Sequence, residues 1–414
     1  MSAPPLAPSP AAEVVRPLLL ARYVAGAGLG RLADEGARVC LVLLAIDSGH
    51  GAGLGGLLVG ALMLPHVLAA PAVGVLTDRA RGPQHVAGAG AAGFAVALAA
   101  TAALLGRVPH PVTIAVLVAG GCCGPALTGA LTSHLANLVP EHAVPRAFGL
   151  DSLTYNIAGI GGPAVAALVS GLVSPEAATY VLAGLAGLGA LAIVTLPTGR
   201  RHDRPEHEAA PTMTAGLRAV RESPLLATVT LASTLEMVTY GALPVVAAVL
   251  ATSVGERTAG GWLMTAVAAG ALLGSLAWTV RPLAARHAPA VVMTGLVATA
   301  APIALAALVP RTAPALVVVG LLFALSGLAS GPFMGALFTA RQTLSPPHVR
   351  AQVFTLGAGL RTTAGAGGAV VAGAISGTPT ALQLLVTGGY SLAGGAVGFA
   401  VLRRTRHSPR RAAA

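Results

Sequence analysis

Four ionisable residues lie close together inside one long apolar run near the start of the chain. Arg31 and Glu35 are four residues apart, as are Asp34 and Arg38, so each carboxylate has an arginine on its own face of a helix. Ionisable groups inside a bilayer cost free energy and commonly mark functional sites. Because these four charges cancel, two interpretations stay open. One is a carboxylate that takes up and releases a proton, and the other is a compensated ion network that fixes helix packing.

The composition indicates which kind of element holds these charges. Apolar residues make up 55% of the 414 residues and charged residues only 9%, whereas soluble domains carry about 25% charge. A soluble globular enzyme is therefore excluded, and we expect an all-α membrane protein. A helix needs about 20 apolar residues to cross the hydrocarbon layer. We predict twelve transmembrane helices, at 18–46, 53–76, 86–106, 111–138, 147–173, 177–196, 225–250, 259–280, 288–309, 313–338, 351–375 and 380–402.

A polar stretch divides the twelve segments into two sets of six. The predicted organisation is a tail at 1–17, a six-helix bundle at 18–197, a linker at 198–222, a second bundle at 223–402 and a basic tail at 403–414. Within the linker, residues 213–223 are expected to form a short amphipathic helix at the membrane surface.

The arginines predict the orientation. Eighteen of them, Arg341 included, fall in the tails, the linker and the loops of one side, and three fall in the loops of the other. Basic residues concentrate in cytoplasmic loops, so both termini are expected in the cytoplasm. All 25 basic residues are arginine, which is typical of a GC-rich bacterial genome and favours a bacterial plasma membrane.

The two halves of the chain repeat each other at an offset of about 205 residues. The matched pairs are Arg146-Ala147 with Arg350-Ala351, Gly129-Ala130-Leu131 with Gly335-Ala336-Leu337, and Gly36-Ala37 with Gly241-Ala242. Three matches at nearly one offset indicate a duplication of a six-helix unit into two parallel repeats.

The most specific motif lies between the second and third predicted helices, where residues 74–83 read G-V-L-T-D-R-A-R-G-P. It resembles the signature loop of the major facilitator superfamily, G-x-x-x-D-R-x-G-R, with Gly74, Asp78 and Arg79 in place. Gly82 comes one residue late, and Pro83 replaces the usual basic residue. A glycine lets a neighbouring helix approach closely, and a carboxylate can accept from the amides of a helix N-terminus. The resemblance implies the twelve-helix fold of that family, with these residues at the inner gate.

A second resemblance lies in the fifth predicted helix, at 146–165, R-A-F-G-L-D-S-L-T-Y-N-I-A-G-I-G-G-P-A-V. It is similar to the exporter branch typified by enterobactin exporters and macrolide efflux proteins. In that branch an acid follows a small residue in the first helix, which favours Asp34 as the carboxylate that titrates. Tyr155 and Asn156 could hydrogen-bond the substrate or join neighbouring helices.

Two further charges lie in the second half of the chain. Glu236 is the only acid in its predicted helix and aligns with Arg31 at the offset of 205. It could pair with Arg31 across a central cavity, carry a proton, contact substrate or lie at the periphery. Arg361 follows Arg350 by ten residues. We expect it at the inner gate, with Asp78 as a partner, and the alternative is an anionic group of the substrate.

Several kinds of site are missing from the sequence. It has no P-loop for ATP, no basic patch interleaved with aromatic residues for nucleic acid, no Cys or His spacing for a metal and no catalytic motif. We therefore expect no cofactor and no enzyme activity.

The resemblances imply a secondary transporter, a monomer in the lipid bilayer, that exports a small drug-like or secondary-metabolite molecule by alternating access coupled to protons. The coupling residues would be Asp34, Glu35 and Glu236, set by the arginines beside them. One alternative is an importer or facilitator for a nutrient or carboxylate. Another is a non-transporting sensor or a membrane-embedded enzyme.

Overall fold

The chain folds into helices throughout the residues that the structure, a computed structural model, describes: 17–198, 212, 214–256 and 259–407. No strand occurs among these residues. In chain order the α-helices are α1 (Pro17–Asp47), α2 (Gly51–Met63), α3 (Pro65–Arg79), α4 (Pro83–Leu104), α5 (His110–Pro125), α6 (Leu131–Leu138), α7 (Val144–Leu172), α8 (Pro175–Val194), α9 (Ala215–Glu222), α10 (Pro224–Ser253), α11 (Ala259–Val280), α12 (Ala288–Leu305), α13 (Leu316–Leu344), α14 (Arg350–Ala374) and α15 (Thr380–His407). The short helix α9 lies where the sequence predicted an amphipathic one.

Ten of the described helical segments are long and apolar enough to cross a membrane. The other two long helices are α1 and α14, which carry ionisable residues along their length. Together they make the twelve predicted crossings, with boundaries that differ by at most six residues from those expected. The predicted tails and the first part of the linker lie largely outside the described residues.

Two of the crossings are interrupted at proline. The second changes from α2 to α3 at Pro65, and the fourth passes through a π-helical turn, η2 (Ala126–Ala130), directly after Pro125. Proline has no N–H for the helix ladder, so the chain rearranges there. The π turn places Leu127, Thr128 and Gly129 on the face that looks between the two halves of the molecule.

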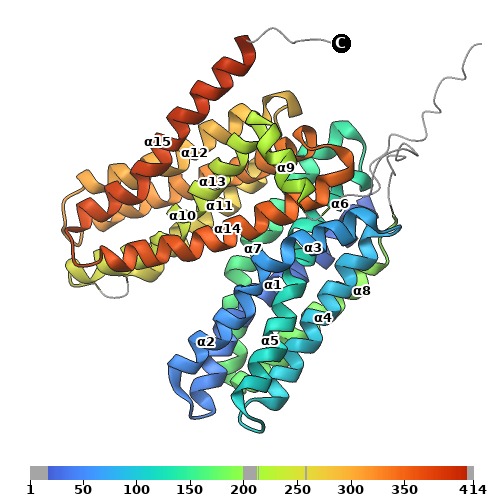
Figure 1. Ribbon diagram of the computed structural model, residues 1–414. Helices are drawn as coiled ribbons and strands as arrows, with labels where there is room; N and C mark the ends of the chain where they lie inside the picture. The colour runs from blue at the N-terminus through green and yellow to red at the C-terminus, as the bar shows by residue number, and fades with distance from the viewer. Residues whose placement is uncertain (1–16, 199–211, 213, 257–258, 408–414) are drawn as a thin grey trace, which may run out of the picture.

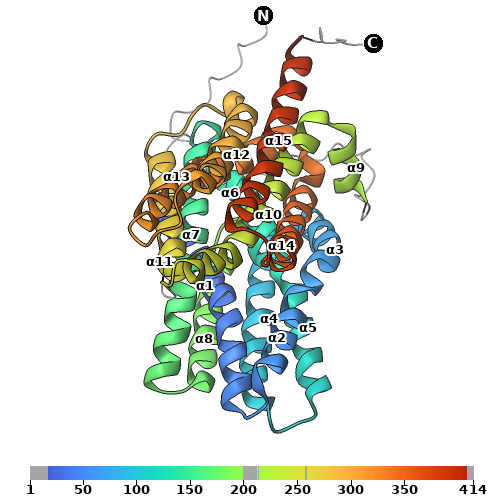
Figure 2. The ribbon, with the colours of Figure 1, turned by 90° about the vertical axis from the view of Figure 1, so that its left-hand side faces the viewer.

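Helices α1–α8 form one bundle and α10–α15 a second (Figures 1 and 2). A Cβ on Gly36 would lie 2.8 Å from the carbonyl oxygen of Gly162, so α1 crosses α7 closely. Gly241 of α10 is pressed in the same way against the backbone of Gly365 in α14. Both crossings join the first and fifth helices of a half, so the glycines that match in sequence also match in structure.

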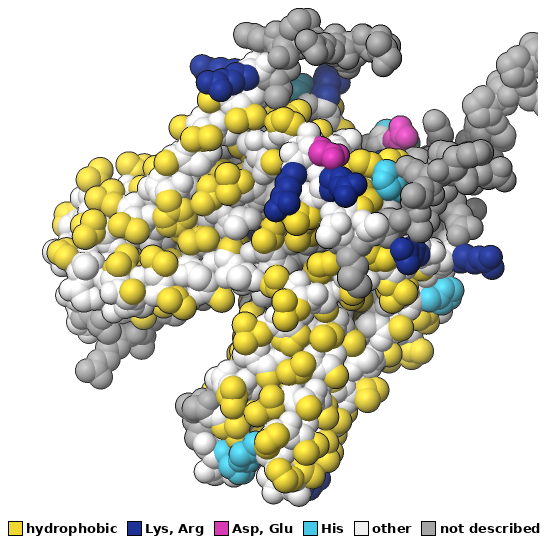
Figure 3. Space-filling view, viewed as in Figure 1, with side chains coloured by type: hydrophobic (Ala, Val, Ile, Leu, Met, Phe, Trp, Pro, Cys, Tyr) yellow, Lys and Arg dark blue, Asp and Glu magenta, His cyan; other side chains and the backbone are white. Residues whose placement is uncertain are grey.

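The bundles contact each other through α3 with α14 and through α7 with α11. These are the second and fifth helices of each half, as a duplicated unit requires. Figure 1 shows the bundles joined at the end where α3, α6 and α9 gather, and diverging toward the other end. In Figure 3 a hollow separates them on the side away from α9. We call the joined end the α9 end.

Candidate functional site

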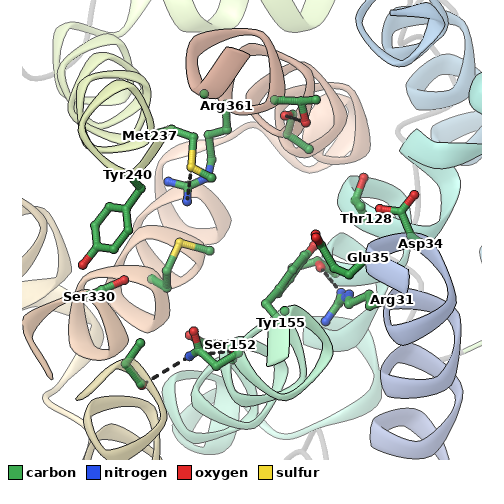
Figure 4. A pocket seen from close by; sticks show the side chains of 18 of the residues that line it. Arg31, Asp34, Glu35, Thr128, Ser152, Tyr155, Met237, Tyr240, Ser330 and Arg361 are labelled. Atoms are coloured by element: carbon green, nitrogen blue, oxygen red, sulfur yellow. Dashed lines mark hydrogen bonds between the residues drawn. The ribbon is translucent and has the colours of Figure 1, made fainter. Parts of the chain in front are cut away.

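A cavity of about 470 Å³ lies between the bundles. Side chains of α1, α2, α3, η2, α6 and α7 line one wall, and side chains of α10, α11, α13 and α14 line the other (Figure 4). The lining includes Tyr155, Asn156 and seven charged residues: Arg31, Asp34, Glu35, Arg38, Glu236, Arg341 and Arg361. The structure therefore brings together, in one cavity, every residue that the sequence proposed for coupling or substrate contact.

On the first wall, one arginine holds two carboxylates. Arg38 Nη2 lies 2.8 Å from Asp34 Oδ2, and Arg38 Nη1 lies 2.8 Å from Glu35 Oε2. The pairing of Asp34 with Arg38 is as predicted. The side chains of Asp34 and Glu35 are 20% and 32% exposed, so both are accessible from the cavity.

The predicted pair of Arg31 with Glu35 is wrong. Arg31 Nη1 lies 2.7 Å from Asp151 Oδ1 on α7, and Arg31 Nη2 donates to Thr132 Oγ1 at 2.9 Å. The side chains of Arg31 and Asp151 are 3% and 0% exposed. Spacing along α1 gave Arg31 the reach to Glu35 but could not show that its face packs against a buried carboxylate. Leaving that carboxylate unpaired would cost much free energy.

The same buried pair organises the polar groups around it. Asp151 also accepts from the hydroxyl of Tyr23 at 2.6 Å and from Thr132 Oγ1 at 2.9 Å. The guanidinium carbon of Arg31 lies 3.7 Å from the centroid of the Tyr155 ring, a cation–π contact that fixes this ring at the cavity surface. Sequence reasoning missed Asp151, although it is the only acid in its predicted helix.

On the second wall, Glu236 pairs with Arg361. Glu236 Oε2 lies 2.8 Å from Arg361 Nη1, and the two side chains are 2% and 12% exposed. Of the alternatives open for Glu236, the pair with Arg31 across the cavity is therefore wrong, because the ion pair stays within the second bundle. The expected place of Arg361 at the inner gate is also wrong. Ten residues of helix rise about 15 Å, which carries Arg361 from the end of α14 to the middle of the cavity wall.

Arg341 was expected in a cytoplasmic segment, and this is wrong as well. Helix α13 continues to Leu344, and Arg341 is only 1% exposed and lines the cavity. Side chains of a helix lean toward its N-terminus, which for α13 directs Arg341 into the protein. Its Nη2 donates to Ser233 Oγ at 2.9 Å.

The signature loop joins the two bundles at the α9 end. Asp78 Oδ1 accepts from the backbone N–H of Ala351 at 3.0 Å, and Asp78 Oδ2 from that of Gln352 at 3.1 Å. These amides are at the N-terminus of α14, so the predicted acceptor role of Asp78 is confirmed. Arg79 ends α3, and Gly82 directly precedes α4.

Two more contacts tighten this junction. A Cβ on Gly74 would lie 2.6 Å from Gln352 Cα, which confirms that the glycine permits the approach of α14. The side-chain oxygen of Gln352 accepts from the backbone N–H of Gly216 at 3.0 Å. The linker helix α9 is thereby tied to the same end of α14.

Comparisons with known proteins agree with this architecture. A family model described as Major Facilitator Superfamily matches residues 24–369. An uncharacterised MFS-type transporter of Sinorhizobium fredii is 27% identical over 361 residues, which cover 84% of this chain and 86% of the relative.

Solved structures agree with the fold as well. The human organic anion transporter MFSD10 matches with a TM-score of 0.72 at 18% identity, over 92% of this chain and 99% of that one. A bacterial homologue of the iron transporter ferroportin, in an outward-facing state, matches with a TM-score of 0.72 at 15% identity, over 93% and 98%. The E. coli fucose:proton symporter matches with a TM-score of 0.71 at 14% identity, over 94% and 99%.

Proposed function

Because the chain belongs to the major facilitator superfamily, we propose that it is a proton-coupled exporter of a small drug-like or secondary-metabolite molecule. It works as a monomer in a bacterial plasma membrane, with both termini in the cytoplasm. The bundles of 18–197 and 223–402 rock about the cavity, which opens to one side of the membrane at a time. The observation that carries the proposal is the pair of carboxylates, Asp34 and Glu35, that share Arg38 inside this cavity.

Two carboxylates on one guanidinium form a proton site. With both ionised, the set carries one surplus negative charge, and two like charges side by side oppose each other. A proton on either carboxylate neutralises the set, and the other carboxylate keeps its arginine. Glu236 is less suited to this task, because it has an arginine of its own and is 2% exposed. We assign coupling to Asp34 and Glu35, and to Glu236 the holding of Arg361.

The state of the structure fits the loading of protons from outside. The hollow between the bundles opens away from the α9 end, and arginines gather on the surface near α9 (Figure 3). With that end in the cytoplasm, the cavity faces outward, as the ferroportin homologue does in its named state. In this state Asp78 holds the N-terminus of α14 and closes the inner side. Opening inward requires these two hydrogen bonds to break.

The test is transport in vesicles. A thermal-shift screen of metabolites on purified protein supplies a substrate, which is then followed in proteoliposomes with an imposed pH gradient. Asp34→Asn and Glu35→Gln each remove the surplus charge, and we expect either to lower accumulation by about tenfold or more while exchange without a gradient persists. Glu176→Gln is the matched control, because Glu176 is 42% exposed and its arginine partner Arg107 is 65% exposed.

The outcomes separate the alternatives. If both variants concentrate the substrate as the wild type does, the coupling assignment is wrong. Movement of substrate together with protons would indicate an importer, as in the fucose:proton symporter, and transport that ignores the gradient would indicate a facilitator. Protein that moves nothing but modifies lipid would indicate an enzyme instead.

A further inference from the structure

Arg341 is the most deeply buried arginine that lines the cavity. Its exposed fraction is 1%, and it ranks among the largest fully buried side chains among the described residues. A guanidinium has five N–H donors. Of these groups, Nη2 donates to Ser233 Oγ at 2.9 Å, and Nε is buried with no acceptor in the described part of the chain.

No carboxylate of the described residues pairs with this charge. Among the described residues, no Asp or Glu oxygen lies within 4 Å of Arg341. The ion pair on its wall joins Arg361 to Glu236, so the charge of this carboxylate is already balanced by another arginine. Arg361 Nη1 also donates to the backbone oxygen of Ser233 at 3.2 Å. Two guanidinium groups therefore contact one serine, and the carboxylate of Glu236 pairs with only one of them, that of Arg361.

A buried cation without a counter-ion is costly, and proteins rarely keep one unless something pairs with it. Arginine is also the side chain best shaped to take a carboxylate or phosphate with two hydrogen bonds. Because Arg341 faces the cavity, the missing anion can come from a molecule that enters it.

The surroundings of Arg341 indicate what else that molecule carries. Phe338 lies one turn before Arg341 on α13, and its ring centroid is 6.0 Å from that of Tyr155 and 6.1 Å from that of Phe354. All three rings line the cavity. They offer an apolar, aromatic surface directly beside the charge. On the other wall of the cavity, the surplus carboxylate of Asp34 and Glu35 repels an anion, which directs it toward Arg341.

We propose that Arg341 binds the anionic group of the substrate, a carboxylate on an apolar, preferably aromatic, body that contacts Tyr155, Phe338 and Phe354. The proposal rests on the proposed transport function, and it names the substrate class of the same cavity.

The test compares acids with their amides. Binding of benzoate, 2-naphthoate and decanoate to the purified full-length protein is measured by thermal shift and titration, each against the uncharged carboxamide of the same shape. The amide corrects for partition into detergent. We expect the carboxylate to bind about tenfold more tightly than its amide in at least one of the three pairs. Absence of any preference for the carboxylate in all three pairs would overturn the proposal, and this measurement needs no variant.

Variants then locate the site. Arg341→Gln is expected to lower the affinity for the bound carboxylate about tenfold and leave that for its amide unchanged. Arg341→Lys, which keeps the charge but loses the planar fork, should fall between the two. Arg281→Gln is the matched control, because Arg281 is exposed and does not line the cavity. Equal affinity in Arg341→Gln and the wild type overturns the site.

Two further arms separate the remaining explanations. Sodium chloride and sodium phosphate are titrated alone, and stabilisation equal to that by the organic acid would mean that the site takes an inorganic anion, which overturns the substrate class. Transport of a neutral or cationic molecule that is unaffected by Arg341→Gln also overturns it, while the transporter proposal stands. If carboxylate binding depends on Arg341 but no substrate is transported in vesicles, the anion site stands and the transporter proposal is overturned.

Discussion

The two bundles present opposite charge imbalances to one cavity. The first, with α1 and α7, places two arginines beside three carboxylates, because Arg31 pairs with Asp151 and Arg38 holds both Asp34 and Glu35. The second, with α10, α13 and α14, lines the cavity with two arginines, Arg341 and Arg361, and with one carboxylate, Glu236, which pairs with Arg361. A surplus carboxylate suits a proton and a surplus arginine suits an anion. Under the proposed function, the proton and the anionic substrate would therefore bind to different bundles.

The two imbalances also differ in their access to water. The carboxylates that share Arg38 are 20% and 32% exposed, whereas Arg341 is 1% exposed. A proton site that is accessible to solvent can equilibrate quickly with the aqueous phase. A buried cation binds an anion more strongly, because charge interactions strengthen as water is removed. Each bundle also contains a buried pair of one arginine with one carboxylate, Arg31 with Asp151 in the first and Arg361 with Glu236 in the second. We expect these pairs to stabilise the structure and not to exchange protons or substrate.

The largest loss of stability is expected when the buried ion pair of Arg31 with Asp151 in the first bundle is broken. Asp151→Asn leaves Arg31 buried without a counter-ion, and breaking a buried pair in this way costs about 3 to 5 kcal/mol. We expect a corresponding loss of stability, measured by thermal unfolding in mild detergent. Combining it with Arg31→Met, which removes the stranded charge, should recover part of the loss. Asp151→Asn with the stability of the wild type would contradict the role of this pair and the charge count of the first wall.

A smaller effect is expected at the junction that keeps both walls facing one cavity. Gly74→Ala would place its Cβ 2.6 Å from Gln352 Cα, and such overpacking costs about 1 to 3 kcal/mol. This strain falls on the state of the present structure, where α3 touches α14, and should shift molecules toward a state in which these two helices separate. Spin-label distances between the open ends of the bundles would report the shift.

The matched control for this change is Gly60→Ala in α2, because a Cβ there meets nothing within 4 Å. Gly60→Ala should leave the distance distribution as it is in the wild type. If Gly74→Ala also leaves it unchanged, the contact between α3 and α14 does not decide which side the cavity opens to.

The helices were predictable from the sequence because the signal is repeated and local. Twelve apolar runs, the linker after the sixth and a duplication offset of about 205 residues all agree with the observed elements. The contact of Asp78 with a helix N-terminus was predictable for the same reason, since the residue types and their spacing recur in a known loop. The interruptions at Pro65 and Pro125 were not foreseen, because proline in a membrane helix is tolerated by local rearrangement.

The ion pairs were less predictable, because spacing along one helix says nothing of the neighbouring helix. Arg31 had an acid four residues away and still paired with Asp151 on α7, 120 positions later in the chain. Arg341 looked cytoplasmic, because helix α13 runs six residues past the predicted end at 338. Ion pairing depends on how each helix is rotated about its axis and on which side chains are buried. Neither can be predicted from the number and spacing of the charged residues.

A third prediction sharpens the comparison by increasing one imbalance. Glu236→Gln removes the one carboxylate that the described residues place on this cavity wall and leaves Arg361 unpaired, so the wall gains a second uncompensated cation. We expect the affinity for a bound carboxylate such as 2-naphthoate to rise about three- to tenfold, measured by titration of purified protein. Glu176→Gln, on the exposed surface, should leave the affinity unchanged. A lower affinity in Glu236→Gln would show that Glu236 orients the anion site and does not compete with it.

The smallest effect is expected at Asp34, and it tests which interpretation of the first-helix charges is right. In Asp34→Asn the guanidinium of Arg38 keeps Glu35 at 2.8 Å, and the lost pair was partly exposed to water. Solvent-exposed pairs contribute about 0 to 1 kcal/mol, and this pair is only partly buried, so the stability should fall by about 1 kcal/mol, against the much larger loss in Asp151→Asn. The two variants are compared in one thermal unfolding series. If Asp34→Asn is destabilised as strongly as Asp151→Asn, then Asp34 belongs to a structural network like that of Arg31. The wet proton site would then lose its physical basis, because a carboxylate that the fold needs ionised cannot be neutralised in every transport cycle.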